Sequence, residues 1–212
     1  MIAEFSDLAE QAHGSVILRY GNTAVLATAV MSERVREDID YFPLTVEYEE
    51  RFYAAGQILG SRFVRREGRP SEQAILSGRV VDRTIRPLFP QHIRNEVQVI
   101  ITVLSYDGTH DPVFAGFVGA SAALSISTLP FLGPLGISRI GIKNGETLIN
   151  PDVSEFEHLD LDLIVATTRD KIAMVEAEGK QIKDEVVFEM IKKASANAIK
   201  NINSIFLKIC PK

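Results

Sequence analysis

The sequence predicts an α+β fold, and three observations predict it. Strands come first in the chain as a hairpin, few segments have helical periodicity, and strands and helices alternate too irregularly for a doubly wound sheet. The 212 residues are 46% hydrophobic and 24% charged, which is the composition of an ordinary globular core.

The first expected elements are two strands, residues 15–20 and 23–30, joined by a turn at Gly21-Asn22. We expect no strand before this hairpin. A third strand, residues 42–50, follows, and Glu47, Glu49 and Glu50 cluster at its end. Paired carboxylates bind metals or act in acid–base chemistry. Nothing else nearby supports such a site, so we favour a solvated strand end.

Arginines are concentrated between residues 62 and 94. This stretch holds eight of the fourteen arginines, no lysine and three acids, so its charge is +5 (eight minus three) in a chain of net charge −5. The guanidinium group presents a planar fork of donors and a face that stacks on rings, which suits phosphate and nucleobase together. The eight arginines are Arg62, Arg65, Arg66, Arg69, Arg79, Arg83, Arg86 and Arg94.

The first part of this stretch, residues 62–70, is expected to be an exposed loop because glycine and proline bound it. Phe63 lies beside Arg65 and Arg66, and Arg69 follows. An aromatic face for a base and cations for the phosphates are the combination that binds single-stranded nucleic acid. We therefore expect these four residues to bind RNA or a polyphosphate.

A helix is expected from its cap at Ser71 to about residue 86, before Pro87. Three arginines fall on one stripe of it, and four apolar residues form a stripe beside them. Ion pairs with Asp82 and Glu72, or a solvated helix face, are the alternative interpretation of each arginine. The arginines are Arg79, Arg83 and Arg86, and the apolar residues are Ile75, Leu76, Val80 and Val81.

The second half of the chain predicts further strands and two helices. Residues 97–106 are nearly all apolar, which predicts a strand buried on both faces. A helix then begins with Asp111 as its cap and Pro112 at its first position. Two hairpins, 136–149 around Asn144-Gly145 and 159–177, precede a final helix over 184–209.

Other chemistry finds little support in the sequence. The four histidines have no metal-ligand spacing, one cysteine cannot form a zinc cluster, and no phosphate-binding glycine loop is present. The first ten residues carry three acids instead of a signal peptide, and the longest apolar region is interrupted by polar residues, glycines and prolines. We therefore expect a cytoplasmic protein.

The motifs FVRREGRPSE, RVVDRTIRPLFP and NEVQVI resemble the first of the two RNase PH-type domains of the bacterial polynucleotide phosphorylase family. The segments GSVILRYGNTAVLATAV, DYFPLTVEYEERFYAAGQI, GASAALSIS and GPLGISRIG extend the resemblance over nearly the whole chain. The resemblance implies an RNase PH-like fold (ribosomal protein S5 domain 2-like) with mixed sheets. We expect this domain over residues 1–182 and a C-terminal helix over 183–212 that packs on it and leads into an interdomain linker.

The resemblance also implies a function. That family degrades RNA from its 3′ end by phosphorolysis, with inorganic phosphate as the attacking group, Mg²⁺ as cofactor and nucleoside diphosphates as products. The loop from Phe63 to Arg66 is implied to face the pore of a ring and to grip single-stranded RNA. Arg62 resembles an insertion, and Val64 stands where a second aromatic is common. The implied partners are a second RNase PH-type domain and further copies, as a trimer or a hexameric ring of domains.

This copy of the domain is expected to be non-catalytic. In the catalytic copy, serines at the start of a helix bind the attacking phosphate through free N–H groups, but residues 111–113 here are Asp-Pro-Val. Asp160 and Asp162 lie on one face of a strand and are candidate Mg²⁺ ligands. Asp162 matches a metal-binding acid, whereas Phe156 and Ile164 replace its partner acid and the catalytic lysine. We therefore expect no catalytic residue, and no cofactor, in this chain.

Two functional hypotheses remain from the sequence. In the first, the chain is the RNA-binding ring domain of an exoribonuclease whose second domain catalyses the reaction. In the second, it is a stand-alone, non-catalytic RNA-binding or ring-forming module of the exosome type. A third idea, a stand-alone phosphorolytic enzyme, requires the phosphate site that residues 111–113 lack.

Overall fold

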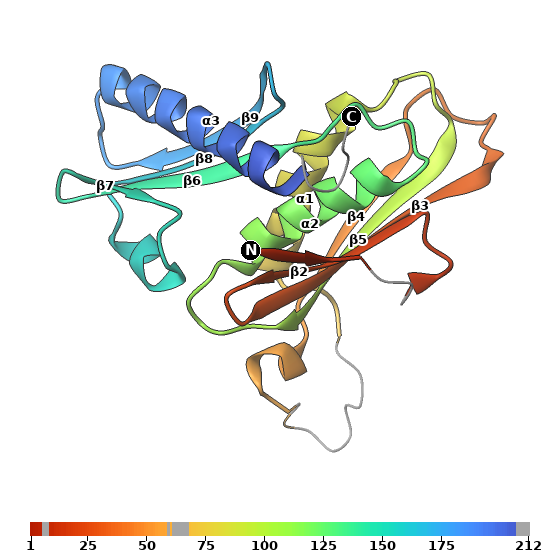
Figure 1. Cartoon of the computed structure of the whole chain (residues 1–212), viewed down its shortest axis with the longest axis horizontal. Coiled ribbons are helices and arrows are strands. Elements are labelled where there is room, and N and C mark those ends of the chain that lie inside the picture. The colour runs from red at the N-terminus through yellow and green to blue at the C-terminus, as the bar shows by residue number, and fades with distance from the viewer. Residues whose placement is uncertain (6–8, 59, 61–67, 207–212) are drawn as a thin grey trace. The chain divides into compact units, whose positions relative to one another are not determined.

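The computed structural model of the chain describes residues 1–5, 9–58, 60 and 68–206. The chain forms two compact units, residues 1–132 and residues 133–212 (Figure 1). Among the described helices, none combines the length and the apolar character needed to cross a bilayer.

The first unit is built on a five-stranded sheet with the order β1-β2-β3-β5-β4. All neighbours are antiparallel except β4 and β5, which are parallel. The predicted hairpin at Gly21-Asn22 is confirmed, and Gly21 has the positive φ of 60° that such a turn requires. The expectation that no strand precedes it is wrong, because β1 pairs with β2. The strands are β1 (Ile2–Glu4), β2 (Gly14–Tyr20), β3 (Thr23–Val35), β4 (Leu44–Glu49) and β5 (Asn95–Ser105).

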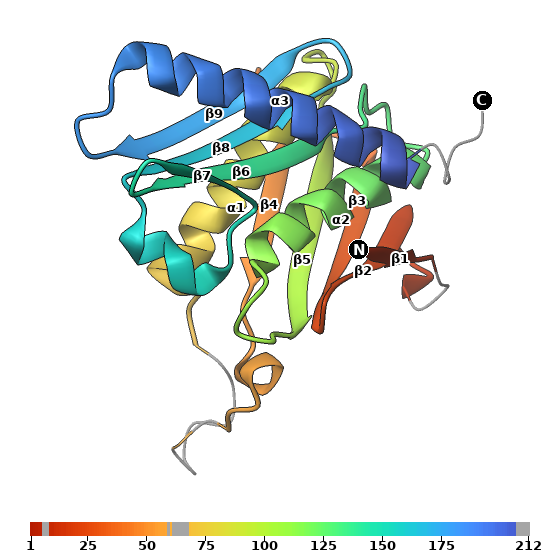
Figure 2. The ribbon, with the colours of Figure 1, turned by 60° about the vertical axis from the view of Figure 1, so that its left-hand side comes forward.

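Two helices, α1 (Glu72–Ile85) and α2 (Pro112–Ile126), cover one face of this sheet (Figure 2). Helix α2 is apolar on all sides, and every residue from 114 to 124 is buried. Its glycines permit close packing, since a Cβ added at Gly119 would lie 3.2 Å from Ala27 Cβ. The predicted burial of β5 on both faces is wrong. Its side chains alternate between buried and half-buried, because both helices lie on the same face.

The second unit has an antiparallel sheet of order β7-β6-β8-β9, with helix α3 (Asp184–Phe206) on one face. Both predicted hairpins are confirmed, and the turn residues Asn144 and Gly145 have φ values of 51° and 84°. The predicted helix is confirmed as far as residue 206, and residues 207–209 lie outside the described part. The strands are β6 (Gly136–Lys143), β7 (Glu146–Ile149), β8 (Leu161–Thr167) and β9 (Ile172–Gly179).

The core between α3 and its sheet is apolar and closely packed. Its buried members are Ile140, Ile142, Leu161, Leu163, Val165, Met190 and Ala194. Helix α3 thus packs within the second unit, whereas the boundary predicted after residue 182 stays a prediction. The described residues also include the short 3₁₀ helices η2 (Phe52–Ala55), η3 (Arg86–Leu88) and η4 (Val153–His158).

We predict that Gly136→Ala destabilises the protein. The added Cβ would lie 2.2 Å from Ala198 O and 2.7 Å from Ile202 Cγ1, so α3 must shift away from β6. Overpacking of this kind costs about 1 to 3 kcal/mol. Urea unfolding measures the loss, with Gly60→Ala as the control, because a Cβ at Gly60 meets no atom within 4 Å. Equal stability of the two variants would contradict the close approach of α3 to β6.

Candidate functional site

Several segments of the first unit meet at one edge of its sheet. The parallel strands β4 and β5 both end there, so η2, which follows β4, lies near residues 106–111, which follow β5. The β2–β3 turn reaches the same edge, because Ala24 pairs with Ser105. We call this region, residues 21–22, 50–58 and 106–111, the carboxyl edge (Figure 1).

The carboxylate of Asp107 connects these segments. Its Oδ1 accepts hydrogen bonds from Thr23 Oγ1 at 3.0 Å and from the backbone N–H groups of Thr109 and His110 at 2.9 Å each. Its Oδ2 accepts from Asn22 N at 3.1 Å and lies 2.7 Å from His110 Nδ1. One side chain therefore holds the hairpin turn against the loop that leads into α2.

Hydrogen bonding sets the ionisation of Asp107. Burial by itself raises the pKa of this carboxyl group. Hydrogen bonds from His110, Thr109 and Asn22 to the charged form outweigh burial and hold the pKa well below its usual range. Sequence reasoning missed this residue. The signal was the segment Asp107-Gly108-Thr109-His110, because aspartate at the start of a turn bonds N–H groups two and three residues later.

The start of α2 has an internal carboxylate as its cap. Asp111 Oδ1 accepts from Val113 N at 2.8 Å, which confirms the predicted cap, and Pro112 at the first helical position has no N–H group to offer. The carboxylate of Asp111 thus lies at the N-terminus of α2, where the N–H groups of a helix would otherwise bind an external anion.

The predicted arginine loop is described only in part. Phe63, Arg65 and Arg66 lie outside the described residues, whereas Arg69 is described and exposed. Helix α1 begins directly after this segment at the predicted cap, where Ser71 Oγ accepts from Ala74 N at 3.0 Å. Ser71 Oγ also donates to Glu50 Oε2 at 2.8 Å, which fixes the start of α1 at the end of β4.

Helix α1 turns its small residues toward β4. A Cβ added at Gly78 would lie 3.4 Å from Val46 O. Ile75 and Leu76 are 47% and 53% exposed whereas Val81 is fully buried, so only part of the predicted apolar stripe belongs to the buried face. The buried residues are Ala74, Ser77, Gly78, Val81, Thr84 and Ile85.

The three arginines of the predicted row on α1 differ in their surroundings, because two are exposed and one has internal partners. Arg79 and Arg83 are exposed, and neither forms an ion pair or a side-chain hydrogen bond within the described part of the chain. They occupy the outer face of α1, together with the exposed Ile75 and Leu76. This face combines guanidinium groups with apolar area.

Arg86, which was expected to contact RNA, is engaged in internal contacts. Its guanidinium group bonds both carboxylate oxygens of Asp82, at 2.6 and 3.1 Å, and the backbone oxygens of Phe42 and Leu44, at 3.0 and 3.1 Å. The ion-pair interpretation is therefore correct for this arginine. Since α1 rises about 1.5 Å per residue, Arg86 lies roughly 22 Å along the helix from Ser71.

The acids at the end of β4 are engaged in internal contacts. Glu49 pairs with Arg51 at 2.6 Å and accepts from Thr102 Oγ1 at 3.0 Å. Glu47 Oε1 lies 3.5 Å from Gln98 Nε2, a distance at the limit of a hydrogen bond. Among the residues that the structure describes, no group of three or more potential metal ligands occurs.

Asp162 on β8 is neutralised by an arginine. Arg139 Nε and Nη2 donate to its two carboxylate oxygens at 2.8 and 2.5 Å, and the guanidinium carbon lies 3.3 Å from the centroid of the Phe156 ring. Both side chains are mostly buried. The guanidinium group of Arg139 therefore occupies both carboxylate oxygens of Asp162, the residue expected to be a vestigial metal ligand. Arg139 was missed, although a charge in the middle of a mostly apolar strand requires a partner.

Comparison with protein families matches both units. Residues 1–130 match domain 1 of the 3′ exoribonuclease family, and residues 133–197 match its domain 2. The gap between the two matches coincides with the boundary between the two compact units.

Related proteins are polyribonucleotide nucleotidyltransferases. The chain is 54% identical over 191 residues to the one from Pelotomaculum thermopropionicum, which covers 90% of this chain and 26% of that protein. It is 46% identical over 206 residues to the one from Maricaulis maris, which covers 97% of this chain and 29% of that protein. The chain thus spans about a quarter of the length of these relatives.

Two solved structures share the fold. Rice (Oryza sativa) Rrp46 superposes with a TM-score of 0.74 at 17% identity, over 97% of this chain and 93% of that chain. A chain of the Archaeoglobus fulgidus exosome with RNA bound to the active site superposes with a TM-score of 0.73 at 23% identity, over 97% and 88%.

We predict that Asp107→Asn destabilises the protein at pH 7 by about 1 to 3 kcal/mol, because the amide cannot replace all the accepted hydrogen bonds. The depressed pKa means that the stabilisation is present above the unfolded pKa of about 3.9 and is lost as the pH falls toward the folded pKa. The difference from the unsubstituted chain should therefore shrink below about pH 4. Urea unfolding between pH 2 and 7 measures it.

The control for this variant is Asp38→Asn. Asp38 is 72% exposed and pairs with Arg36, and solvent screening leaves such a surface ion pair little effect on stability. A constant difference between Asp107→Asn and the unsubstituted chain at every pH would refute the role of the Asp107 charge.

Proposed function

Because the chain belongs to the 3′ exoribonuclease family and has its RNase PH-like fold, we propose that it is a non-catalytic RNA-binding domain of a phosphorolytic 3′-to-5′ exoribonuclease. The full protein is then a polyribonucleotide nucleotidyltransferase, in which this chain forms the first RNase PH-type domain. It converts RNA and inorganic phosphate into nucleoside diphosphates, with Mg²⁺ as cofactor of the second domain. We place this mRNA degradation in the cytoplasm.

The observation that carries the proposal is the exposed positive charge just before α1 and along it, from Arg69 to Arg83 in its last turn. Arg69, Arg79 and Arg83 are exposed, and the described residues supply no acid to pair with them. They continue the charge of the loop with Arg65 and Arg66, which precedes α1 in the sequence. A chain of phosphates is a ligand that matches an extended row of guanidinium groups.

Two internal ion contacts support a non-catalytic role. Asp111 caps α2 where the attacking phosphate binds in a catalytic copy, and Arg139 neutralises Asp162 where a metal ligand is required. Each position has an internal partner, so neither is available for phosphate or metal. The reaction is therefore assigned to a second RNase PH-type domain.

Assembly is part of the proposal. A domain that holds RNA for another domain must bring its arginines to a shared path. A ring of RNase PH-type domains, built by three copies of the full protein, provides such a path through its pore. The relatives are about four times as long as this chain, which leaves room for the second domain.

We predict that Arg79→Ala with Arg83→Ala weakens binding of single-stranded RNA by this chain and flattens its salt dependence. Each lost phosphate contact removes counterion release, so the slope of log K against log salt should fall in magnitude by about 1.4 for two contacts. Fluorescence anisotropy of a labelled oligonucleotide between 50 and 200 mM salt, roughly the range where such effects are large, measures both quantities.

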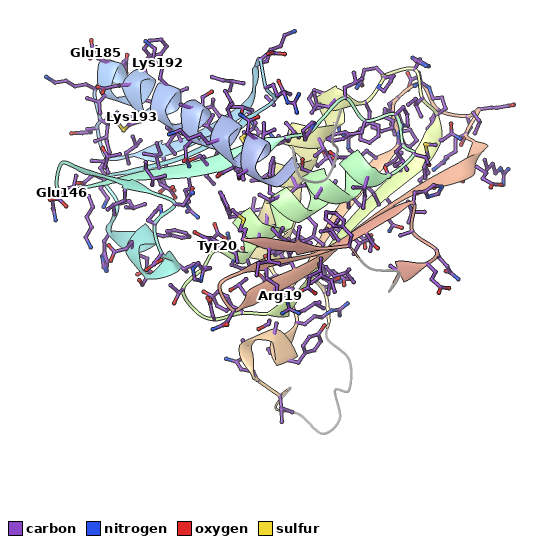
Figure 3. All side chains as sticks on the ribbon, viewed as in Figure 1. Arg19, Tyr20, Glu146, Glu185, Lys192 and Lys193 are labelled. Carbon is purple, nitrogen blue, oxygen red and sulfur yellow. The ribbon has the colours of Figure 1, made fainter. Side chains whose placement is uncertain are left out.

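Lys192→Ala with Lys193→Ala is the matched control. It removes the same charge from α3 in the second unit (Figure 3), where we propose no RNA contact. If both double variants change the slope equally, the arginines act only through net charge and the proposed site is wrong.

We also predict that this chain alone does not cleave RNA. Incubated with single-stranded RNA, inorganic phosphate and Mg²⁺, it should release no nucleoside diphosphate above a protein-free blank, because its phosphate and metal positions have internal partners. Chromatographic detection of nucleoside diphosphates is the measurement. Their release at a rate proportional to the concentration of the chain would refute the non-catalytic assignment.

A further inference from the structure

The short helix η2 presents aromatic side chains at the carboxyl edge. Tyr53 is 57% exposed and Phe52 is 46% exposed, and Ile58, shortly after the helix, is 93% exposed. In Figure 2 the orange turn of η2 lies beyond the end of β4, away from the helices that cover the sheet. Phe52 and Tyr53 are adjacent in the chain, so this short helix places two large, partly exposed aromatic side chains on one turn.

The backbone of η2 is fixed by hydrogen bonds. The buried Ala54 accepts at its backbone oxygen from Tyr106 N at 2.8 Å, which joins η2 to the end of β5. Within the turn, Gly56 N donates to Tyr53 O at 3.0 Å, and Gly56 has the positive φ of 69° that closes a helix end. Because the turn is already ordered, a ligand that stacks on Tyr53 pays little to order it.

The dimensions and the chemistry of this surface favour one occupant. A stable protein partner needs about 800 Å² on each side, far more than the side chains of one four-residue turn present. The segment that follows η2 in the sequence carries Arg62, Arg65, Arg66 and Arg69. Aromatic faces next to guanidinium groups are the combination that binds single-stranded nucleic acid.

We propose that Tyr53, flanked by Phe52 and Ile58, is a stacking platform for an unpaired base of single-stranded RNA. Arg51 beside it is paired with Glu49 at 2.6 Å, so the platform contributes stacking while the arginines contribute the phosphate contacts. This inference rests on the proposed function and adds to it a base-contacting subsite outside the arginine loop.

The test compares Tyr53→Ala with the unsubstituted chain for two labelled oligonucleotides. One is a single-stranded RNA, and the other is an abasic strand of the same length and charge. Stacking on an aromatic residue corresponds to about a 5- to 150-fold change in affinity. We expect a loss in this range for the RNA and no change for the abasic strand, while Tyr53→Phe, which keeps the ring, binds both like the unsubstituted chain.

Tyr41→Ala is the matched control, because Tyr41 is 59% exposed and lies in the segment that precedes β4, outside the carboxyl edge. It should leave both affinities unchanged. Unchanged RNA binding by Tyr53→Ala overturns the inference, and so does an equal loss for both oligonucleotides, which would indicate a structural role of Tyr53.

A second variant, Arg65→Ala with Arg66→Ala, separates the two proposals. If it weakens RNA binding while Tyr53→Ala does not, the proposed function stands and the stacking platform is wrong. If the unsubstituted chain does not bind the RNA at all, the proposed function is overturned and the platform with it.

Discussion

The carboxylate of Asp107 is the interaction on which the carboxyl edge depends. A nearly buried acid needs donors, and here they come from the β2–β3 turn and from the loop that enters α2. Thr23 donates to it and accepts in return from Asp107 N at 3.2 Å. The rings of Tyr20 and His110, 4.2 Å apart, cover this cluster. The end of β5, which also anchors η2, is thereby held in one position.

The charges of the two units follow one rule. Charged groups at positions that resemble catalytic ones have internal partners, namely Val113 N for Asp111 and Arg139 for Asp162. A buried charge with satisfied partners binds an external ion poorly, because the ion must first displace them. Arg79 and Arg83 differ, since they are exposed on the outer face of α1. Only the second kind of charge is available to a ligand.

Turns and helix caps could be predicted because they depend on residues close together in the sequence. Features that depend on tertiary contacts could not. The turns at Gly21 and Asn144 and the caps at Ser71 and Asp111 depend on neighbouring residues, so the sequence identifies them. Which side of β5 is covered depends on where both helices pack, which periodicity does not reveal. The partners of Arg86 include backbone oxygens more than forty residues away, beyond the reach of a helical pattern. The sequence therefore identified which arginines are concentrated at the candidate site. It did not reveal which of them are exposed and which have internal partners.

The exposed groups of the first unit bear on how the proposed RNA binding would depend on sequence. Guanidinium groups contact phosphates, and aromatic rings contact base faces, so neither reads the base edges that distinguish one sequence from another. On α1, Arg79 and Arg83 share the exposed face with the apolar Ile75 and Leu76, which offer no directional hydrogen bonds. Phosphate contacts and base stacking would therefore supply most of the affinity of such a surface for RNA, and its preference for one RNA sequence over another would be weak. The proposed exoribonuclease function requires this property, because each step of 3′-to-5′ degradation places a different base in the same position.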